Sequence, residues 1–282
     1  MGPRSEPGPV DLHTHTTFSD GLFLPEDLVA EAKNRNLSGV AITDHDSVGA
    51  IDRAVAAGKQ HGVEVVPGVE MSCNADGVDV HMLGYYIDHQ AQDVLDFFEN
   101  VRFHREERAR KMIEKLKELD VKVPLERVMA AAQGGSVGRP HVAQAMVEAG
   151  AVPNVEQAFR RYISYEGPAY VPKMKLTPGE AIGFIKQHKG IAVIAHPATY
   201  RNDNAVYTAI AAGVDGIEVW HPDHGPRETS HYKEIAQKNR LLMTGGSDCH
   251  GGRKYNHVFL GEIPIPYRYL AALKRRSRAI RS

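Results

Sequence analysis

Residues 10–15 read Val-Asp-Leu-His-Thr-His, a short apolar run that ends in polar side chains. The next such run, residues 39–46, reads Gly-Val-Ala-Ile-Thr-Asp-His-Asp and ends in the same way. Between them, Pro25–Asn36 has the composition of a helix with proline in its first turn. A strand, a helix and a second strand in succession predict parallel strands with helices on the outside.

This alternation continues along most of the chain. Further strands are expected at Val63–Val66, Val78–Ile87, Gly190–Ala195, Gly216–Trp220 and Leu241–Thr244. Helices are expected between most of them, including Val48–His61 and Arg227–Asn239, and a last helix at Tyr267–Arg276. The count is about seven strand–helix units, close to that of a closed α/β barrel. The sequence therefore predicts an α/β fold, a distorted seven-stranded barrel.

Residues 96–176 interrupt the alternation with helical patterns and no convincing strand. A long charged helix is expected from Val94 to about Leu119, and it should present mainly a solvated face. We interpret residues 96–176 as a helical insertion domain that covers the barrel mouth as a lid. Residues 10–95 and 177–282 would form the barrel, and residues 1–9 a flexible lead-in. Such a lid favours small substrates or a threaded chain end.

The composition excludes several classes of protein. Lys and Arg number 34 against 35 Asp and Glu, a formal net charge of −1, which argues against binding along a long stretch of nucleic acid. Two cysteines do not make a disulfide scaffold, so a reducing compartment, the cytoplasm, is expected. The sequence shows no apolar run of about 18 residues and no secretory signal pattern, so no membrane association is expected.

Histidines and carboxylates follow the predicted strands, where active sites form in parallel barrels. Side chains alternate along a strand, so His13 and His15 point the same way and can share one metal ion. Asp248 and His250 repeat this spacing. Imidazole with carboxylate suits Zn, Mn or Fe better than Ca or Mg. The candidate ligands are too many for one ion and fit two or three divalent metals: His13, His15, Asp20, His45, Glu70, His81, His196, Asp248 and His250.

A metal cluster of this kind suits the hydrolysis of a phosphate ester. Metals lower the pKa of a bound water, so that metal-activated hydroxide exists near neutral pH, and they neutralise the phosphoryl oxygens. The sequence contains no Gly-x-Ser-x-Gly elbow and no Walker loop. Asp44 and Asp46 flank His45, and we expect them to orient that imidazole instead of binding metal. The sequence therefore predicts a metal-dependent phosphoesterase.

At these motifs the sequence resembles the polymerase-and-histidinol-phosphatase (PHP) family of metal phosphoesterases. The matching stretches are Asp-Leu-His-Thr-His at 11–15, Thr-Asp-His-Asp at 43–46, Pro-Gly-Val-Glu at 67–70, Ala-His-Pro at 195–197 and Gly-Ser-Asp-Cys-His at 246–250. They occur in the family's order, and the resemblance covers nearly all of the chain from Val10 onward. It implies a distorted seven-stranded barrel, in agreement with the strand count.

Three further stretches resemble the TrpH subgroup of that family, at residues 138–141, 169–173 and 217–224. Members of the subgroup are similar to phosphatases that remove the 3′-phosphate of 3′,5′-bisphosphonucleotides, and some are 5′-to-3′ exoribonucleases on short RNA. The resemblance implies a small nucleotide or an RNA 5′ end as the substrate. Two alternatives stay open. A histidinol-phosphate phosphatase would share the metal motifs, and a non-catalytic metal-bearing binding module would bind without turnover.

The resemblance also implies a role for each site residue. The first metal would be held by His13, His15, Glu70 and Asp248, the second by Glu70, His81 and His196, and the third by Asp20, His45 and His250. Manganese is the first choice of ion, with iron or zinc as alternatives. The catalytic groups would be Asp20, His45, Glu70 and His221. The phosphate contacts would be Arg139, His141, Lys173 and His224, although Arg139 and His141 could instead cap the helix at Pro140, and His221 and His224 could be structural.

Overall fold

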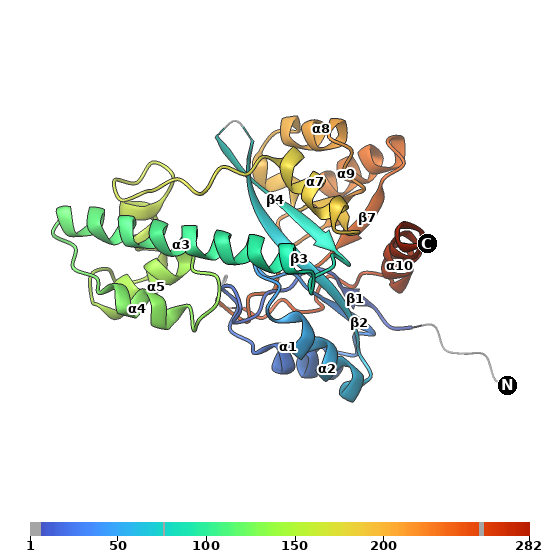
Figure 1. The fold of residues 1–282 in the computed structure, drawn as a ribbon, viewed down its shortest axis with the longest axis horizontal. Coiled ribbons are helices and arrows are strands. Elements are labelled where there is room, and N and C mark those ends of the chain that lie inside the picture. Colours follow the sequence, from blue (N-terminus) through green and yellow to red (C-terminus); the bar gives the residue numbers. More distant parts are fainter. Residues whose placement is uncertain (1–6, 76, 254–256) are drawn as a thin grey trace.

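A computed structural model describes residues 7–75, 77–253 and 257–282, so residues 1–6 of the predicted lead-in lie outside the described part. Within it, seven strands form one sheet in chain order (Figure 1). They are β1 (Val10–Asp11), β2 (Gly39–Ile42), β3 (Glu64–Ala75), β4 (Val78–Tyr85), β5 (Ile191–Ile194), β6 (Gly216–Trp220) and β7 (Leu242–Gly245). A hydrogen bond closes the ring of strands: His15 N, just after β1, donates to Cys249 O, just after β7, at 2.9 Å. The predicted distorted seven-stranded barrel is confirmed.

The hairpin of β3 and β4 departs from the predicted parallel arrangement. β4 runs antiparallel to both β3 and β5, and β3 continues to Ala75 instead of ending at Val66. Only two residues separate the two strands, whereas a parallel connection needs a crossover of a dozen residues or more. Gly77 in this turn has a φ of 89°, which side chains other than glycine rarely adopt. Glu70 and His81 consequently project from within strands and not from strand ends.

Helices cover the outside of the barrel. They are α1 (Pro25–Asn34), α2 (Ile51–His61), α7 (Pro178–Gln187), α8 (Asn204–Ala211) and α9 (Pro226–Lys238), with a short 3-10 helix, η2 (Pro197–Tyr200), after β5. Their buried side chains, such as Leu28, Ile51 and Ile182, pack into one apolar cluster with the outer face of the strands. Burial of this kind fixes the strands, and so fixes the loops that carry the polar side chains.

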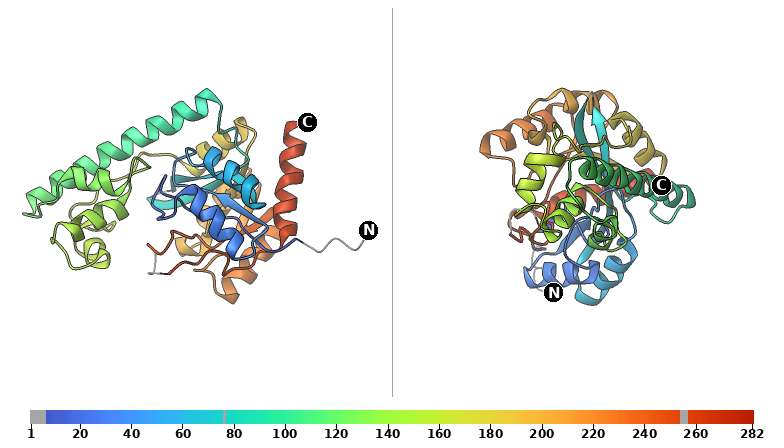
Figure 2. Two further views of the ribbon diagram at one scale, coloured as in Figure 1. Left: turned by 90° about the horizontal axis from the view of Figure 1, so that it is seen from below. Right: turned by 90° about the vertical axis from the view of Figure 1, so that its left-hand side faces the viewer.

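Helix α10 (Tyr267–Arg281) closes the barrel at the end opposite to the polar side chains, and it extends beyond the predicted end at Arg276. Leu270 and Leu273 pack with Leu12 and Leu83 inside the barrel. Figures 1 and 2 show α10 on the far side of the barrel from α3. The interior beneath the candidate site is therefore apolar and filled.

The predicted helical segment projects from one side of the barrel (Figure 2). It contains α3 (Gln92–Glu118), α4 (Leu125–Ala131), α5 (Arg139–Glu148), α6 (Val155–Ala158) and a π-helical turn, η1 (Phe159–Ile163). Met112, Leu116 and Met146 belong to an apolar cluster of its own, whereas Phe98, near the start of α3, packs in the barrel cluster. Helix α3 thus joins two cores. No helix in the described ranges is long and apolar enough to cross a membrane.

Candidate metal centre and the adjoining cavity

The nine predicted ligands form one cluster, in which the fully buried side chain of Glu70 meets the most partners. Its Oε2 atom is 3.0–3.2 Å from ring nitrogens of His13, His15 and His45. Its Oε1 atom is 2.7 Å from His81 Nδ1 and 2.9 Å from His196 Nε2. One carboxylate therefore meets five imidazoles, which come from four different parts of the barrel.

Two further carboxylates complete the cluster. Asp248 Oδ1 is 3.1 Å from His15 Nε2, and Asp20 Oδ1 is 3.3 Å from His250 Nε2. His45 Nε2 lies 3.9 Å from the same oxygen of Asp20. The antiparallel strand β4 contributes His81 to this cluster from a mid-strand position, where it pairs with Ser72 of β3.

Three groups of these side chains each bring their ligand atoms within 4.8 Å of one another: His13, His15, Glu70 and Asp248; His45, Glu70 and His81; and His15, Asp20, His45 and His250. The first group has the same members as the predicted first metal site. The other two differ in detail, because His45 joins Glu70 and His81, and His15 joins Asp20. His196 is not a member of these compact groups, but its Nε2 contacts Glu70 Oε1, the oxygen that His81 also contacts.

The donor set fits divalent cations. Three buried atoms at the cluster lie close to a charged group but make no hydrogen bond of regular geometry: His15 Nε2, Asp20 Oδ1 and His45 Nδ1. Folded proteins rarely leave such atoms unsatisfied, and ligation of a cation would satisfy all three. The burial of His45 outweighs its carboxylate neighbours and holds its pKa well below the usual range, so the ring is neutral and has a lone pair to donate.

The carboxylates also create a field that favours positive charge. Burial lowers the pKa of His15, but Asp248 and Glu70 outweigh burial and raise that pKa to about 10. Burial likewise raises the pKa of Glu70, yet His45, His81 and His13 prevail and hold it well below its usual range. A buried site of this charge, with imidazole and carboxylate donors, suits divalent metal cations.

Three positions at this site have an unusual backbone. Asp46, His196 and Asp248 have φ angles of 49°, 25° and 49°, in the region that non-glycine residues rarely occupy. Such positions gather at functional sites, where the surrounding structure holds them. Nearby, a Cβ atom on Gly246 would lie 2.3 Å from His13 N, so the close approach of the two chain segments requires glycine.

Glu218 is a site residue that the sequence analysis did not single out as one. Its Oε1 atom is 3.0 Å from His13 Nδ1, and its Oε2 atom accepts the His196 backbone N–H at 2.7 Å. Burial raises the pKa of Glu218, but His13 outweighs burial and the pKa falls to about 2. The sequence does contain a sign of this role, because Glu218 is a charged residue within the apolar run Gly216–Trp220. A buried strand tolerates a charge only when that charge has a partner.

The predicted role of Asp44 and Asp46 was wrong, because neither of them contacts His45. Asp44 accepts from Thr16 and Ser19, at 2.7 Å from Thr16 N and 2.6 Å from Ser19 Oγ. Asp46 accepts from Ser72 N at 2.8 Å and pairs with Arg105 of α3. His45 therefore faces the cluster, while the hydrogen bonds of its two neighbours go to other partners.

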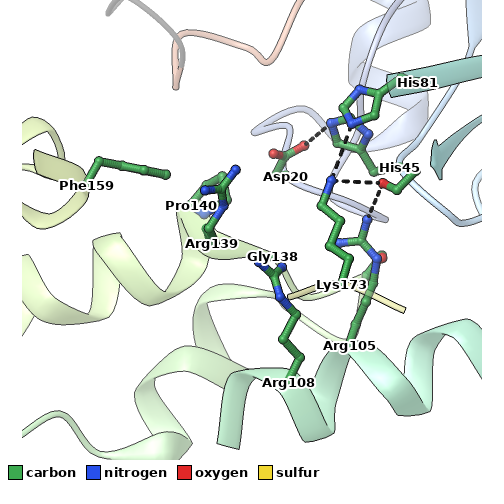
Figure 3. Close-up of a pocket in the computed structure, with 12 residues that line it drawn as sticks. Asp20, His45, His81, Arg105, Arg108, Gly138, Arg139, Pro140, Phe159 and Lys173 are labelled. Carbon is green, nitrogen blue, oxygen red and sulfur yellow. Dashed lines mark hydrogen bonds and ion pairs between the residues drawn. The ribbon is translucent and has the colours of Figure 1, made fainter. Parts of the chain in front are cut away.

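A cavity of about 150 Å³ lies between the cluster and the helical segment (Figure 3). Arg139 and Lys173, two predicted phosphate contacts, both line it. Lys173 Nζ is 3.2 Å from Asp79 Oδ2 and 3.4 Å from His81 Nε2. Arg139 stacks on Tyr165, 4.3 Å from the ring centroid. The remaining lining residues include Asp20, His45 and His81 on one side and Arg105, Arg108 and Phe159 on the other.

Three other predicted residues are not among those that line this cavity. His141 Nδ1 accepts the N–H of Gly138 at 2.9 Å, so this buried ring caps α5, as the alternative interpretation allowed. His221 Nδ1 accepts the N–H of Asp223 at 3.0 Å, and its Nε2 lies 3.4 Å from Asp248 Oδ2. His224 Nδ1 is 2.9 Å from Val219 O. His221 thus lies at the metal cluster beside Asp248, whereas His141 and His224 are held by backbone groups.

Comparison with known proteins agrees with this geometry. A family model described as "PHP domain" matches residues 11–165. The 5′-3′ exoribonuclease Rnm of Escherichia coli K12 is 32% identical over 247 residues, 85% of this chain and 84% of the relative. The 3′,5′-nucleoside bisphosphate phosphatase of Chromobacterium violaceum is 31% identical over 259 residues, 88% and 91% of the two chains.

A crystal structure described as that of a metal-dependent phosphoesterase from Bifidobacterium adolescentis has a TM-score of 0.87 and 33% identity, and the match covers 97% of each chain. The fold and the cluster of ligands together define a metal-dependent phosphoester hydrolase. The chain belongs to the PHP family.

Proposed function

We propose that this enzyme cleaves the 3′-phosphoester of a nucleotide that carries a second phosphate, removing the 3′-phosphate of 3′,5′-bisphosphonucleotides and also releasing nucleotides from the 5′ end of short RNA. One observation supports the proposal above the others. A single cavity is lined both by metal-ligand groups, Asp20, His45 and His81, and by four cationic side chains, Arg105, Arg108, Arg139 and Lys173. Several cations beside a metal centre suit a substrate with more than one phosphate.

The two kinds of relative support one substrate class. A bisphosphatase and a 5′-3′ exoribonuclease act on molecules that share a unit, a ribose with a phosphate on its 5′ oxygen and a phosphoester on its 3′ oxygen. They differ only in whether the 3′ phosphate is a monoester or a diester. The cavity is small, about 150 Å³, which favours one nucleotide at a time over a long duplex.

We also propose the metal positions. His13, His15, Glu70 and Asp248 would hold one ion, Glu70, His81 and His196 a second, and Asp20, His45 and His250 a third; the distances above support each set. Bound divalent ions, Mn²⁺ in our proposal with iron or zinc as alternatives, supply charge neutralisation at the phosphoryl oxygens and a more acidic water.

The protein side chains then have separate tasks. Lys173 and Arg139 bind non-bridging oxygens of the phosphate, and Asp79 holds Lys173 in place at 3.2 Å. The carboxylate of Glu218 fixes the ring of His13. The Nδ1 atom of His221 accepts a backbone N–H, so the ring proton is on Nε2. This Nε2–H donates toward Asp248. The catalytic role that the sequence analysis gave to His221 thus becomes, in our proposal, the positioning of a ligand.

Residues 96–176 would act as a lid that contributes the four cationic side chains. The side chains of Val101, His104, Met174 and Leu176 line one small space, so the chain enters and leaves the segment at neighbouring points. A variant with residues 106–172 replaced by a short Gly-Ser linker is therefore feasible. It should keep the metal centre and lose most nucleotide affinity; unchanged affinity in the folded variant would exclude the lid.

The function is tested with a substrate panel: a 3′,5′-bisphosphonucleotide, histidinol phosphate and a short 5′-phosphorylated RNA, each with Mn²⁺ and with chelator. Release of phosphate or nucleotide from the first or third, abolished by chelator, is the expected result. Activity confined to histidinol phosphate would instead identify a histidinol-phosphate phosphatase. Nucleotide binding without turnover would indicate a binding module. The cytoplasmic location stays a prediction.

A further inference from the structure

Arg108 of α3 is a buried cation that the proposed metal chemistry does not use. Its side chain is only 7% exposed, and it lines the cavity beside the metal cluster. Its Nε atom donates to Val171 O at 2.7 Å, whereas its Nη2 atom is buried without a hydrogen-bond partner. In Figure 3 the guanidinium points from α3 toward the side of the cavity where Gly138 and Arg139 lie.

The charges around this cavity leave Arg108 uncompensated. Arg105 pairs with Asp46, and Lys173 and Arg139 share Asp79 at 3.2 Å and 3.9 Å. Within the described residues no carboxylate lies in ion-pair distance of Arg108. Burial lowers the pKa of Arg108 to about 10, and the like charges of Arg139 and Arg105 act in the same direction. A buried cation without a partner is costly, so an anionic ligand is the natural complement.

We propose that Arg108 binds the second, non-scissile phosphate of the substrate and so selects nucleotides that carry a 5′-phosphate. This inference rests on the proposed function and adds a residue for specificity. A guanidinium matches phosphate geometry, and a phosphate oxygen would satisfy Nη2 where the protein offers no acceptor. Phe159 and Arg139 line the same cavity, so the second phosphate would lie on the side of the helical segment, away from His45 and His81.

A purely structural role is the competing explanation. Through Nε, Arg108 ties α3 to the segment at Val171, and its guanidinium lies 5.7 Å from the ring centroid of Tyr170. Two substitutions separate the roles. Arg108→Gln keeps an N–H donor for Val171 O and removes the charge, whereas Arg108→Met removes both. Arg110→Gln is a matched control, because Arg110 is on the same helix, solvent-facing, and paired with Glu107 at 3.2 Å.

The test is steady-state kinetics of each variant with Mn²⁺ on adenosine 3′,5′-bisphosphate and on adenosine 3′-monophosphate, which lacks the second phosphate. We expect Arg108→Gln to lower kcat/KM for the bisphosphate by about 10- to 100-fold and to change that for the monophosphate by less than about 2-fold. Inhibition by the product adenosine 5′-monophosphate should weaken in parallel, while inhibition by adenosine stays the same.

Equal losses on both substrates, or no loss on either, would overturn the role of Arg108 while the proposed function stands. Wild-type enzyme that cleaves neither compound and no RNA would instead overturn the proposed function, and the inference with it. If Arg108→Met does not fold, Arg108→Gln and the inhibition constants still decide the question.

Discussion

Glu218 holds the imidazole of His13 by a hydrogen bond of 3.0 Å from Nδ1 to Oε1, and both side chains are completely buried. Because Nδ1 donates to this carboxylate, Nε2, which faces Glu70 Oε2 at 3.2 Å, is the nitrogen that would ligate a metal ion. The same carboxylate accepts the backbone N–H of His196. One buried acid on β6 thus orients two candidate ligands that lie far from it in the sequence.

The first prediction concerns this acid. In Glu218→Gln the amide can donate to Nδ1, which would place the proton of His13 on Nε2 and remove the lone pair that a metal needs. We expect a loss of about 10- to 100-fold in metal affinity or activity. Metal titration monitored by activity and by metal content measures it, with Glu234→Gln on the exposed face of α9 as the control. Unaltered metal affinity would show that Glu218 does not position His13.

The second prediction concerns metal and stability. The ligands come together only in the folded chain, so Mn²⁺ should stabilise the folded state through mass action. At 100 times the dissociation constant the gain is about 2.7 kcal/mol, a rise in Tm of about 5–10 °C for a chain of this size. Thermal melting with Mn²⁺ and with chelator measures the rise, which Asp248→Asn should reduce. Equal melting temperatures in both conditions would contradict a metal centre.

The third prediction separates a catalyst from a binding module. His45 lies between Glu70 and Asp20 and lines the cavity, so His45→Ala should lower kcat on the order of 100-fold or more. The ring is partly exposed, and its removal should leave the fold intact. His231→Ala is the control, because His231 pairs with Asp203 on an exposed surface. Full turnover by His45→Ala, measured as phosphate release, would exclude the proposed role.

The fourth prediction concerns the ion pair between Asp46 and Arg105, which joins α3 to the loop after β2. Both side chains are nearly buried, so Arg105→Gln should lower the free energy of unfolding by about 3–5 kcal/mol, through the unpaired charge that it leaves on Asp46. Adding Asp46→Asn should recover part of this loss, and urea denaturation of the double-mutant cycle measures the coupling. Arg53→Gln, which breaks an exposed pair with Glu26, should change stability little. Additive losses in the cycle would show that the two side chains are not coupled.

Local patterns in the sequence were enough to predict most elements. Apolar runs such as Gly216–Trp220 were strands, and the capping box of Thr177 and Glu180 marks the start of a predicted helix. The antiparallel course of β4 was missed, although the Asp-Gly pair at residues 76–77 is a hairpin signal. The repeated strand–helix pattern favoured parallel strands and outweighed that short signal.

The sequence by itself determined the candidate ligands, because residues such as His13 and His15 share a face through strand alternation and need only a few neighbouring residues to be recognised. Only the tertiary structure decided which oxygen each imidazole meets and that Glu218 orients His13. It also decided that the Nη2 atom of Arg108 is buried without a hydrogen-bond partner. These are relationships between side chains as many as 205 positions apart, and no local periodicity encodes them. They depend on how packed helices and strands bring distant segments into one buried volume.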